Sequence, residues 1–334
     1  MKSFRDFLER INLIESEEHI LKKNSNNKQY LEKMYEMLLV LKDKISDKEF
    51  DDIIDNKLLF KQKFNINSYM QGMVEFVVNS SCCFMYPEKF EYEKKYNLDK
   101  NVDCSFEFNS IKEAIRKINV EVKCPEYGKN ENKTLITLNR VEKEKFKELV
   151  NNPEWKKRRD LKLKDYLESG QSKFINSPED HINILLICLD NEIDLLEWIY
   201  YLIATKDGMI RKPEVYEMNF KDFDRVDAVF ITDLYIRHKQ AEKNYCMLGE
   251  CYTFGVINEE SLLNKIHKIN DLTEKENFFK NSTLEQKYNF IIISEIFNNL
   301  MLEFIEYESG LSNDIDKAKS LFEFIKYKDF SLSN

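Results

Sequence analysis

The chain has 334 residues, with 51 Lys and Arg against 60 Asp and Glu, and therefore a formal net charge of −9. An acidic chain of this kind is not held to nucleic acid by its overall charge, so any such contact needs a local basic surface. The hydrophobic share of 43% supports a large core and excludes a disordered chain. The length fits two domains, or one domain with appendages.

Two enzyme classes and one kind of metal site are disfavoured by the scarcity of particular residues. Only 7 glycines occur, and the nearest pair is Gly249 and Gly255, so the spacings of a P-loop and of a dinucleotide-binding loop are missing. The 7 cysteines are odd in number and lack C-x-x-C spacing, which predicts reduced thiols. No two of the 4 histidines have H-x-x-x-H spacing, which disfavours a histidine-based zinc site.

The amino terminus gives no indication of export or of a membrane anchor. It is charged from Lys2 onward and has no apolar signal sequence. No apolar run approaches the ~18 residues that span a bilayer. We therefore expect a soluble, cytoplasmic protein with no membrane contact.

The order of the predicted elements indicates an α/β core between helical ends. Residues 1–68 are predicted to be a helical N-terminal region, in which Ser46 and Glu49 form a capping box. Residues 258–334 are predicted to be helical again, with a second capping box at Ser282 and Glu285. The elements expected between them, over 69–257, are a helix at 69–79, strands at 102–108 and 118–124, a basic helix at 155–167, a strand at 182–189, a helix at 195–204, and strands at 226–231 and 251–257. The near-continuous apolar strands of the later half predict parallel pairing, buried on both faces.

Two neighbouring predicted strands carry acids and a lysine on one face. Over 102–108 every second residue is apolar, which puts Asp103 on the opposite face, and over 118–124 the same alternation puts Glu121 and Lys123 on one wet face. If the strands pair as a hairpin, these three side chains converge. Two carboxylates suit Mg²⁺ (or Mn²⁺), while a lysine can orient or help to deprotonate an attacking water and offset charge on a phosphorane.

An acid on one strand and Glu-x-Lys on the next, before a helix and a buried strand, resembles the PD-(D/E)XK nuclease superfamily, which includes many restriction endonucleases. The resemblance covers about residues 69–190. It implies a mixed central sheet with a restriction-endonuclease-like core, and Mg²⁺-dependent hydrolysis of phosphodiester bonds in DNA or RNA. It assigns Asp103 and Glu121 to the metal, Lys123 as the catalytic lysine, and Glu75, on the preceding helix, as a further metal-binding acid. Val102 stands in place of the proline that names the motif.

The tripeptide alone does not decide the matter, because Glu-x-Lys occurs five times in the chain. Only the copy at Glu121 lies on an alternating strand that follows another alternating strand with an acid. The competing interpretation is a half-exposed hairpin whose outer face is merely charged. For Glu75, the alternative is the polar stripe of a helix.

A basic run is the candidate contact surface for a nucleic-acid backbone. Its six cationic side chains are Lys156, Lys157, Arg158, Arg159, Lys162 and Lys164. In the geometry of the superfamily, Gln171 and Lys173, farther along the same helix, could also reach a scissile phosphate. The alternative is a solvated helix face.

Two other functions stay open. Asp190 and Asp233 follow predicted strands and could form a different Mg²⁺ site, as in phosphatase- or receiver-like domains, although strand-end acids also cap helices. A non-catalytic binding or assembly protein would instead dock a protein partner, or a second copy, through the helical ends. His238 is expected to be a lone surface or core histidine rather than a catalytic one.

Overall fold

The computed structural model describes most of the first 124 residues and parts of the chain up to residue 261. The described residues are 3–96, 100–109, 115–124, 159–178, 181–189, 198, 201–202, 208–210, 212–232, 234–235, 238, 253–258 and 261. The predicted C-terminal helical region, with its capping box at Ser282, lies almost entirely outside them. The same holds for the helix predicted at 195–204.

The helices come first along the chain and the strands of a mixed sheet follow. The elements are α1 (Phe4–Asn12), α2 (Ile20–Lys23), α3 (Lys28–Lys42), α4 (Asp47–Asp52), a π-helix η1 (Ile53–Lys57), α5 (Ile66–Met85), β1 (Glu91–Tyr92), β2 (Cys104–Asn109), β3 (Ile115–Lys123), α7 (Arg159–Phe174), β4 (Ile182–Cys188), the 3₁₀ turns η4 (Pro213–Tyr216) and η5 (Phe220–Asp222), β5 (Ala228–Thr232) and β6 (Thr253–Ile257). The chain therefore has the predicted α/β character.

Helix termini follow their local sequence signals. The capping box predicted at Ser46 is present, since the Ser46 hydroxyl accepts from the Glu49 backbone and the Glu49 carboxylate accepts from the Ser46 backbone. Helix α5 starts three residues before the predicted position because the Asn65 side chain caps it. It continues six residues past the predicted end, where Ser80 and Cys83 donate to backbone oxygens of α3 and Cys82 is buried.

The six strands form one sheet in the order β1-β2-β3-β4-β5-β6, in which β1 has only two residues. Strands β2 and β3 form an antiparallel hairpin, β3, β4 and β5 are parallel, and β6 returns antiparallel to β5. The predicted mixed sheet is confirmed. The parallel pairing predicted for the apolar strands is confirmed for β4 and β5. For β6 the expectation of parallel pairing is wrong.

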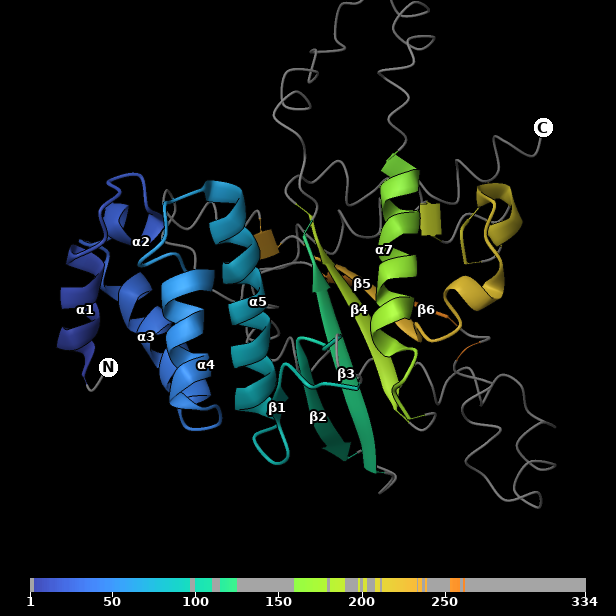
Figure 1. Cartoon of the computed structure of the whole chain (residues 1–334), viewed down its shortest axis with the longest axis horizontal. Coiled ribbons are helices and arrows are strands. Elements are labelled where there is room, and N and C mark those ends of the chain that lie inside the picture. Colours follow the sequence, from blue (N-terminus) through green and yellow to red (C-terminus); the bar gives the residue numbers. More distant parts are fainter. Residues whose placement is uncertain are drawn as a thin grey trace, which may run out of the picture.

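Each face of the sheet is covered by a helix (Figure 1). Helices α1 to α5 stand on one side, with α5 next to β2 and β3, and α7 lies on the other side against β3 and β4. Strand β4 is buried along its whole length, and its residues alternate between two apolar clusters: Ile184 and Leu186 face α5, whereas Leu185 and Ile187 face α7. This double burial explains why its sequence shows no polar alternation.

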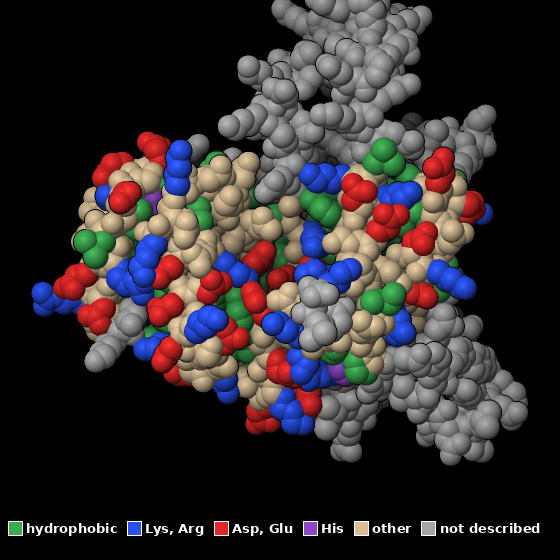
Figure 2. Space-filling model, in the orientation of Figure 1, with side chains coloured by type: hydrophobic (Ala, Val, Ile, Leu, Met, Phe, Trp, Pro, Cys, Tyr) green, Lys and Arg blue, Asp and Glu red, His purple; other side chains and the backbone are tan. Residues whose placement is uncertain are grey.

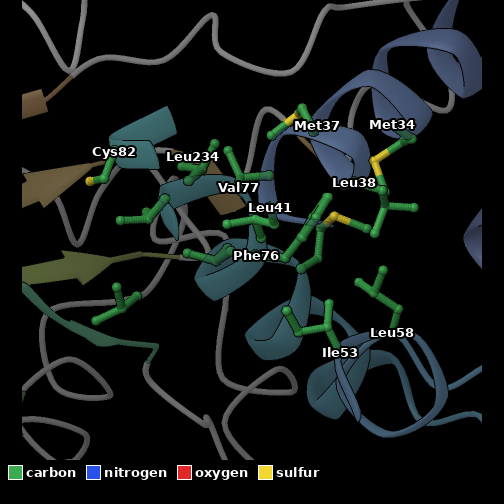
Figure 3. Packing of buried hydrophobic residues seen from close by; sticks show 14 of the residues in the cluster. Met34, Met37, Leu38, Leu41, Ile53, Leu58, Phe76, Val77, Cys82 and Leu234 are labelled. Carbon is green, nitrogen blue, oxygen red and sulfur yellow. The ribbon is translucent and has the colours of Figure 1, made fainter. Parts of the chain in front are cut away.

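The N-terminal helices share one core with the sheet. Phe7 of α1 and Phe230 of β5 belong to the same cluster of buried side chains. Figure 3 shows Leu38 and Leu41 of α3 packed close to Phe76 of α5. The predicted helical region 1–68 is therefore joined to the sheet through α5. Among the described residues, no helix is long and apolar enough to cross a membrane.

Residue His238 ties a late part of the chain to the N-terminal helices. It is buried, its Nε2 lies 3.1 Å from the hydroxyl of Tyr30 on α3, and the rings of Tyr30 and Tyr69 lie beside it. Burial lowers the pKa of His238 to about 3. His238 is thus the core histidine that the sequence favoured over a catalytic one.

Two helical glycines in the part of the chain that the structure describes make a matched pair for a packing test. A Cβ on Gly72 of α5 would lie 2.2 Å from the backbone oxygen of Lys57, whereas a Cβ on Gly170 of α7 would lie 3.4 Å from the side chain of Leu185. We expect Gly72→Ala to destabilise the fold by about 3 kcal/mol, because backbone must move, and Gly170→Ala to be neutral or stabilising by up to ~1 kcal/mol. Chemical denaturation of both variants checks this, and equal effects would contradict it.

The burial of His238 makes stability depend on pH. Its folded pKa is about 3 against 6.5 in the unfolded chain, so the unfolded state binds the extra proton first as the pH falls. Stability is therefore full above pH ~7 and decreases below pH 6.5, by about 2 kcal/mol at pH 5 for this residue. We expect His238→Gln to lose about 2 kcal/mol less than the natural chain between pH 7.5 and pH 5 in urea unfolding. Parallel pH profiles for the two proteins would refute the assignment.

Candidate functional site

The hairpin brings Asp103 and Glu121 to adjacent positions. Cys104 pairs with Val120, so Asp103, one residue before β2, lies opposite Glu121 on β3. The Asp103 carboxylate is anchored there, because its Oδ2 accepts the backbone N–H of Val122 at 2.6 Å. The two acids that the sequence placed on one face therefore lie together.

The position of Asp103 is electrostatically unfavourable for a carboxylate. Burial raises its pKa well above the usual range, and the negative charges of Glu121 and Glu75 raise it further. The Val122 N–H and the ammonium of Lys57 oppose this shift without cancelling it. Three carboxylates thus share one partly dry region, and their mutual repulsion is a cost that a bound cation would remove.

Residue Glu121 holds the centre of the site. Its side chain is only 3% exposed, and its Oε1 lies 2.7 Å from the ammonium of Lys123 and 3.5 Å from that of Lys173 on α7. Its Oε2 is buried and accepts no hydrogen bond within the described part of the chain. A buried carboxylate oxygen without a partner is costly, so this atom is the best candidate in the site for a further ligand.

The polar face of the hairpin is not wet, contrary to the sequence-based expectation. Ser105 and Asn119 are buried as completely as the apolar residues beside them. They satisfy each other, since Ser105 Oγ donates to Asn119 Oδ1 at 2.9 Å, and Asn119 also donates to Asn183 on β4 at 2.7 Å. Tyr96, before β2, donates to Asn119 as well. The alternation was predicted correctly, but the sequence did not reveal that α7 and the segment after β1 cover this face, nor that β4 continues the sheet beside it.

Residue Glu75 is engaged by a lysine from the N-terminal helices. The ammonium of Lys57, at the end of η1, lies 3.1 Å from Glu75 Oε2 and 2.8 Å from Glu93 Oε1, and it sits over the ring of Tyr92. Burial alone would lower the pKa of Lys57, but the charge of Glu75 and the contacts with Tyr92 and Glu93 outweigh it and raise that pKa. Glu75 is therefore a partner of a cation in this structure, and its role as a metal ligand stays a prediction.

Three of the residues expected to contact nucleic acid lie on α7 with their side-chain contacts described: Lys173, Gln171 and Lys164. Lys173 joins the site, where it also donates to the backbone oxygen of Asn101 at 2.8 Å. Gln171 and Lys164 are used elsewhere: the amide of Gln171 bonds to the 221–225 turn through both its nitrogen and its oxygen, and Lys164 donates to the Tyr216 backbone. We therefore leave Gln171 and Lys164 out of the site.

Half of the six cationic residues of the basic run lie beyond the described residues. These are Lys156, Lys157 and Arg158, and only the backbone of Arg159 is described. Lys162 is half-buried and has interactions with neighbouring groups. Figure 2 shows acidic and basic side chains gathered together over the part of the sheet between α5 and α7. Charge of both signs, rather than a purely basic surface, therefore marks this face.

The competing acidic cluster cannot be traced as a unit. Asp190 and Asp233 lie outside the described residues. Asp227, six residues before Asp233, is buried and accepts the N–H of Asn183 and the hydroxyl of Ser261, both at 2.6 Å. Both oxygens of this carboxylate therefore accept hydrogen bonds that join the segment before β5 to β4 and to Ser261.

The donor atoms of the hairpin fit a magnesium ion that keeps most of its waters. Across the described ranges, no group of three or more His, Cys, Asp and Glu side chains is arranged to hold a metal ion. Mg²⁺ does not require such a group, since it is typically bound by one or two carboxylates together with water and substrate phosphate. Asp103 and Glu121, with the unpartnered Oε2 of the latter, meet that requirement.

No family model, no curated protein and no solved structure matches the chain. The assignment of the site therefore depends on its own geometry and charge.

Sequence reasoning missed Lys57, Glu93 and Asn101. Lys57 is 18 residues before Glu75, with no periodicity that connects them, and Glu93 belongs to another Glu-x-Lys copy that has no alternating strand around it. Asn101 Nδ2 donates to Glu93 Oε2 at 3.1 Å while its carbonyl accepts from Lys173. Only the folded chain reveals this continuous series of charged contacts.

The crowding around Asp103 predicts a stability gain when its charge is removed. We expect Asp103→Asn to stabilise the metal-free protein by about 1–2 kcal/mol, because the amide oxygen can still accept the Val122 N–H while the repulsion from Glu121 and Glu75 disappears. The control is Glu107→Gln on β2, whose carboxylate is paired with Lys89 and whose loss should change stability by less than ~0.5 kcal/mol. Urea unfolding in EDTA measures both, and a destabilised Asp103→Asn protein would contradict the crowding.

Proposed function

We propose that the chain is a Mg²⁺-dependent nuclease of the PD-(D/E)XK type that hydrolyses phosphodiester bonds in DNA or RNA. The observation that carries the proposal is the convergence of Asp103, Glu121 and Lys123 on one face of the β2–β3 hairpin. The order of elements supports it, because α5 with Glu75 precedes the hairpin and α7 leads to the parallel strand β4.

The residues of the site have separable roles in this proposal. Asp103 and Glu121 would hold the Mg²⁺ (or Mn²⁺), which would supply Lewis-acid polarisation of the phosphate and an activated water. Lys123 is fixed by its 2.7 Å contact with Glu121 Oε1. In this proposal its ammonium would orient the attacking water and offset charge that develops on the phosphorane. Lys173, 3.5 Å from the same oxygen, adds a second positive charge from α7.

The charge arrangement also argues against a purely structural role. A protein that only docks a partner gains no stability from placing a buried Asp beside two Glu side chains. Unfavourable carboxylate pairs of this kind are common at catalytic sites, where they are retained for ion binding or proton transfer. The crowded carboxylates therefore favour a catalyst over an assembly protein.

The test compares two lysines on the same strand. Lys123→Met should reduce Mg²⁺- or Mn²⁺-dependent cleavage of plasmid DNA or single-stranded RNA by about 10²–10⁴-fold, with an unchanged circular dichroism spectrum, since Lys173 still pairs with Glu121. Lys117→Met is the matched control, because Lys117 pairs with Glu91 at the other end of β3. Full cleavage by Lys123→Met, or no cleavage of either substrate by the natural chain with either metal, would reject the proposal.

A further inference from the structure

A lysine from outside the hairpin reaches the third carboxylate of the site. Lys57 lies 3.1 Å from Glu75 Oε2 and 2.8 Å from Glu93 Oε1, and its side chain is only 20% exposed. The charge of Lys57 also acts on Asp103. The positive charge of Lys57 therefore lies next to Glu75, which is the carboxylate separated from Lys123 by the largest number of intervening contacts.

The backbone on both sides holds this contact in place. Lys57 ends the π-helix η1, and its carbonyl lies so close to α5 that only a glycine fits at position 72. Glu93 adopts the left-handed conformation, with φ of 44°, and its N–H donates to the carbonyl of Asp103 at 2.9 Å. π-helical turns and left-handed non-glycine residues both cost energy and often occur at functional sites. The ammonium is therefore positioned by the fold rather than by a flexible surface side chain.

We propose that the Lys57 ammonium occupies the place of a second metal ion, so that the site binds a single divalent cation through Asp103 and Glu121 and keeps Glu75 out of its coordination. This inference rests on the proposed nuclease function, and it specifies that the active site binds one metal ion.

The charge balance supports one ion. The carboxylates joined in this series of contacts are those of Glu75, Glu93, Asp103 and Glu121, and the ammonium groups are those of Lys57, Lys123 and Lys173. Within the described residues, the series therefore carries one net negative charge, which one divalent ion more than neutralises. Two-metal sites place their ions about 3.5–4 Å apart and need acids to bridge them. The carboxylate of Glu75 already has partners, since its Oε2 accepts from Lys57 at 3.1 Å and its Oε1 from Gln71 at 3.5 Å.

The experiment is a titration of the full chain with MnCl₂. Binding is measured by isothermal titration calorimetry and by the electron paramagnetic resonance signal of free Mn²⁺. The natural chain should bind one Mn²⁺. Lys57→Met should bind a second, and Lys57→Met combined with Glu75→Gln should bind one again, because the second ion depends on Glu75. Lys57→Arg keeps the charge and should bind one. Lys61→Met is the matched control, since Lys61 pairs with Asp55 on the exposed surface.

A single substitution keeps the inference testable if Lys57→Met does not fold. Glu75→Gln should leave the Mn²⁺ affinity of the natural chain within about threefold, whereas Asp103→Asn should reduce it by at least ~100-fold, since even residues that only support a metal ligand are worth 10–100-fold. Equal losses in the two variants would overturn the inference, because Glu75 would then be a ligand.

The outcomes separate this inference from the function on which it depends. If the natural chain binds two Mn²⁺ ions, or a folded Lys57→Met protein binds one, Lys57 does not take the place of a second metal ion. Either result would leave the proposal of a metal-dependent nuclease intact. No Mn²⁺ on the natural chain would overturn both.

Discussion

The buried carboxylate of Glu121 is the interaction on which the rest of the site depends. Its side chain lies between the hairpin and α7, where an isolated negative charge would be too costly to keep. Lys123 comes from the same strand and Lys173 from the helix that packs across it, so two elements must dock correctly before the charge is compensated. The charge of Glu121 is therefore compensated only when β3 is paired in the sheet with β4 and α7 packs across it.

A similar dependence links the N-terminal helices to the hairpin. The cluster of buried side chains that contains Phe7 continues through α5 to the strands, and Lys57 leaves that region to meet Glu75 and Glu93. Its approach requires Gly72 in α5. The helical part of the chain thus supports the site in two ways. It buries the face of the sheet on which α5 packs, and it contributes the charge of Lys57 to Glu75 and Glu93.

The sequence predicted those features that repeat with a short period or carry a local signal. Alternation revealed β2 and β3 and placed Asp103, Glu121 and Lys123 on one face, continuous apolar runs revealed β4 and β5, and a capping box revealed the start of α4. The burial of that face could not be predicted, because Asn119 is a polar residue that also bonds to Asn183 on β4 and to Tyr96 before β2, both outside the hairpin. Polar alternation specifies which side chains share a face and says nothing of what covers them.

The contacts that were missed show why a charged site is harder to predict than the strands that carry it. Lys57 was not predicted, because it is one of many lysines in a Lys- and Glu-rich chain and has no special spacing from Glu75. Lys173 was predicted as a phosphate contact, whereas its contact with Glu121 was not. The importance of both lysines comes from their low exposure, since an ion pair at the surface is worth little, while the loss of one partner of a buried pair leaves an uncompensated charge. The composition shows how many charged side chains the chain has, and only tertiary packing determines which of them are removed from solvent. The site residues that matter most are therefore those for which burial and charge coincide, and this property belongs to the folded chain as a whole.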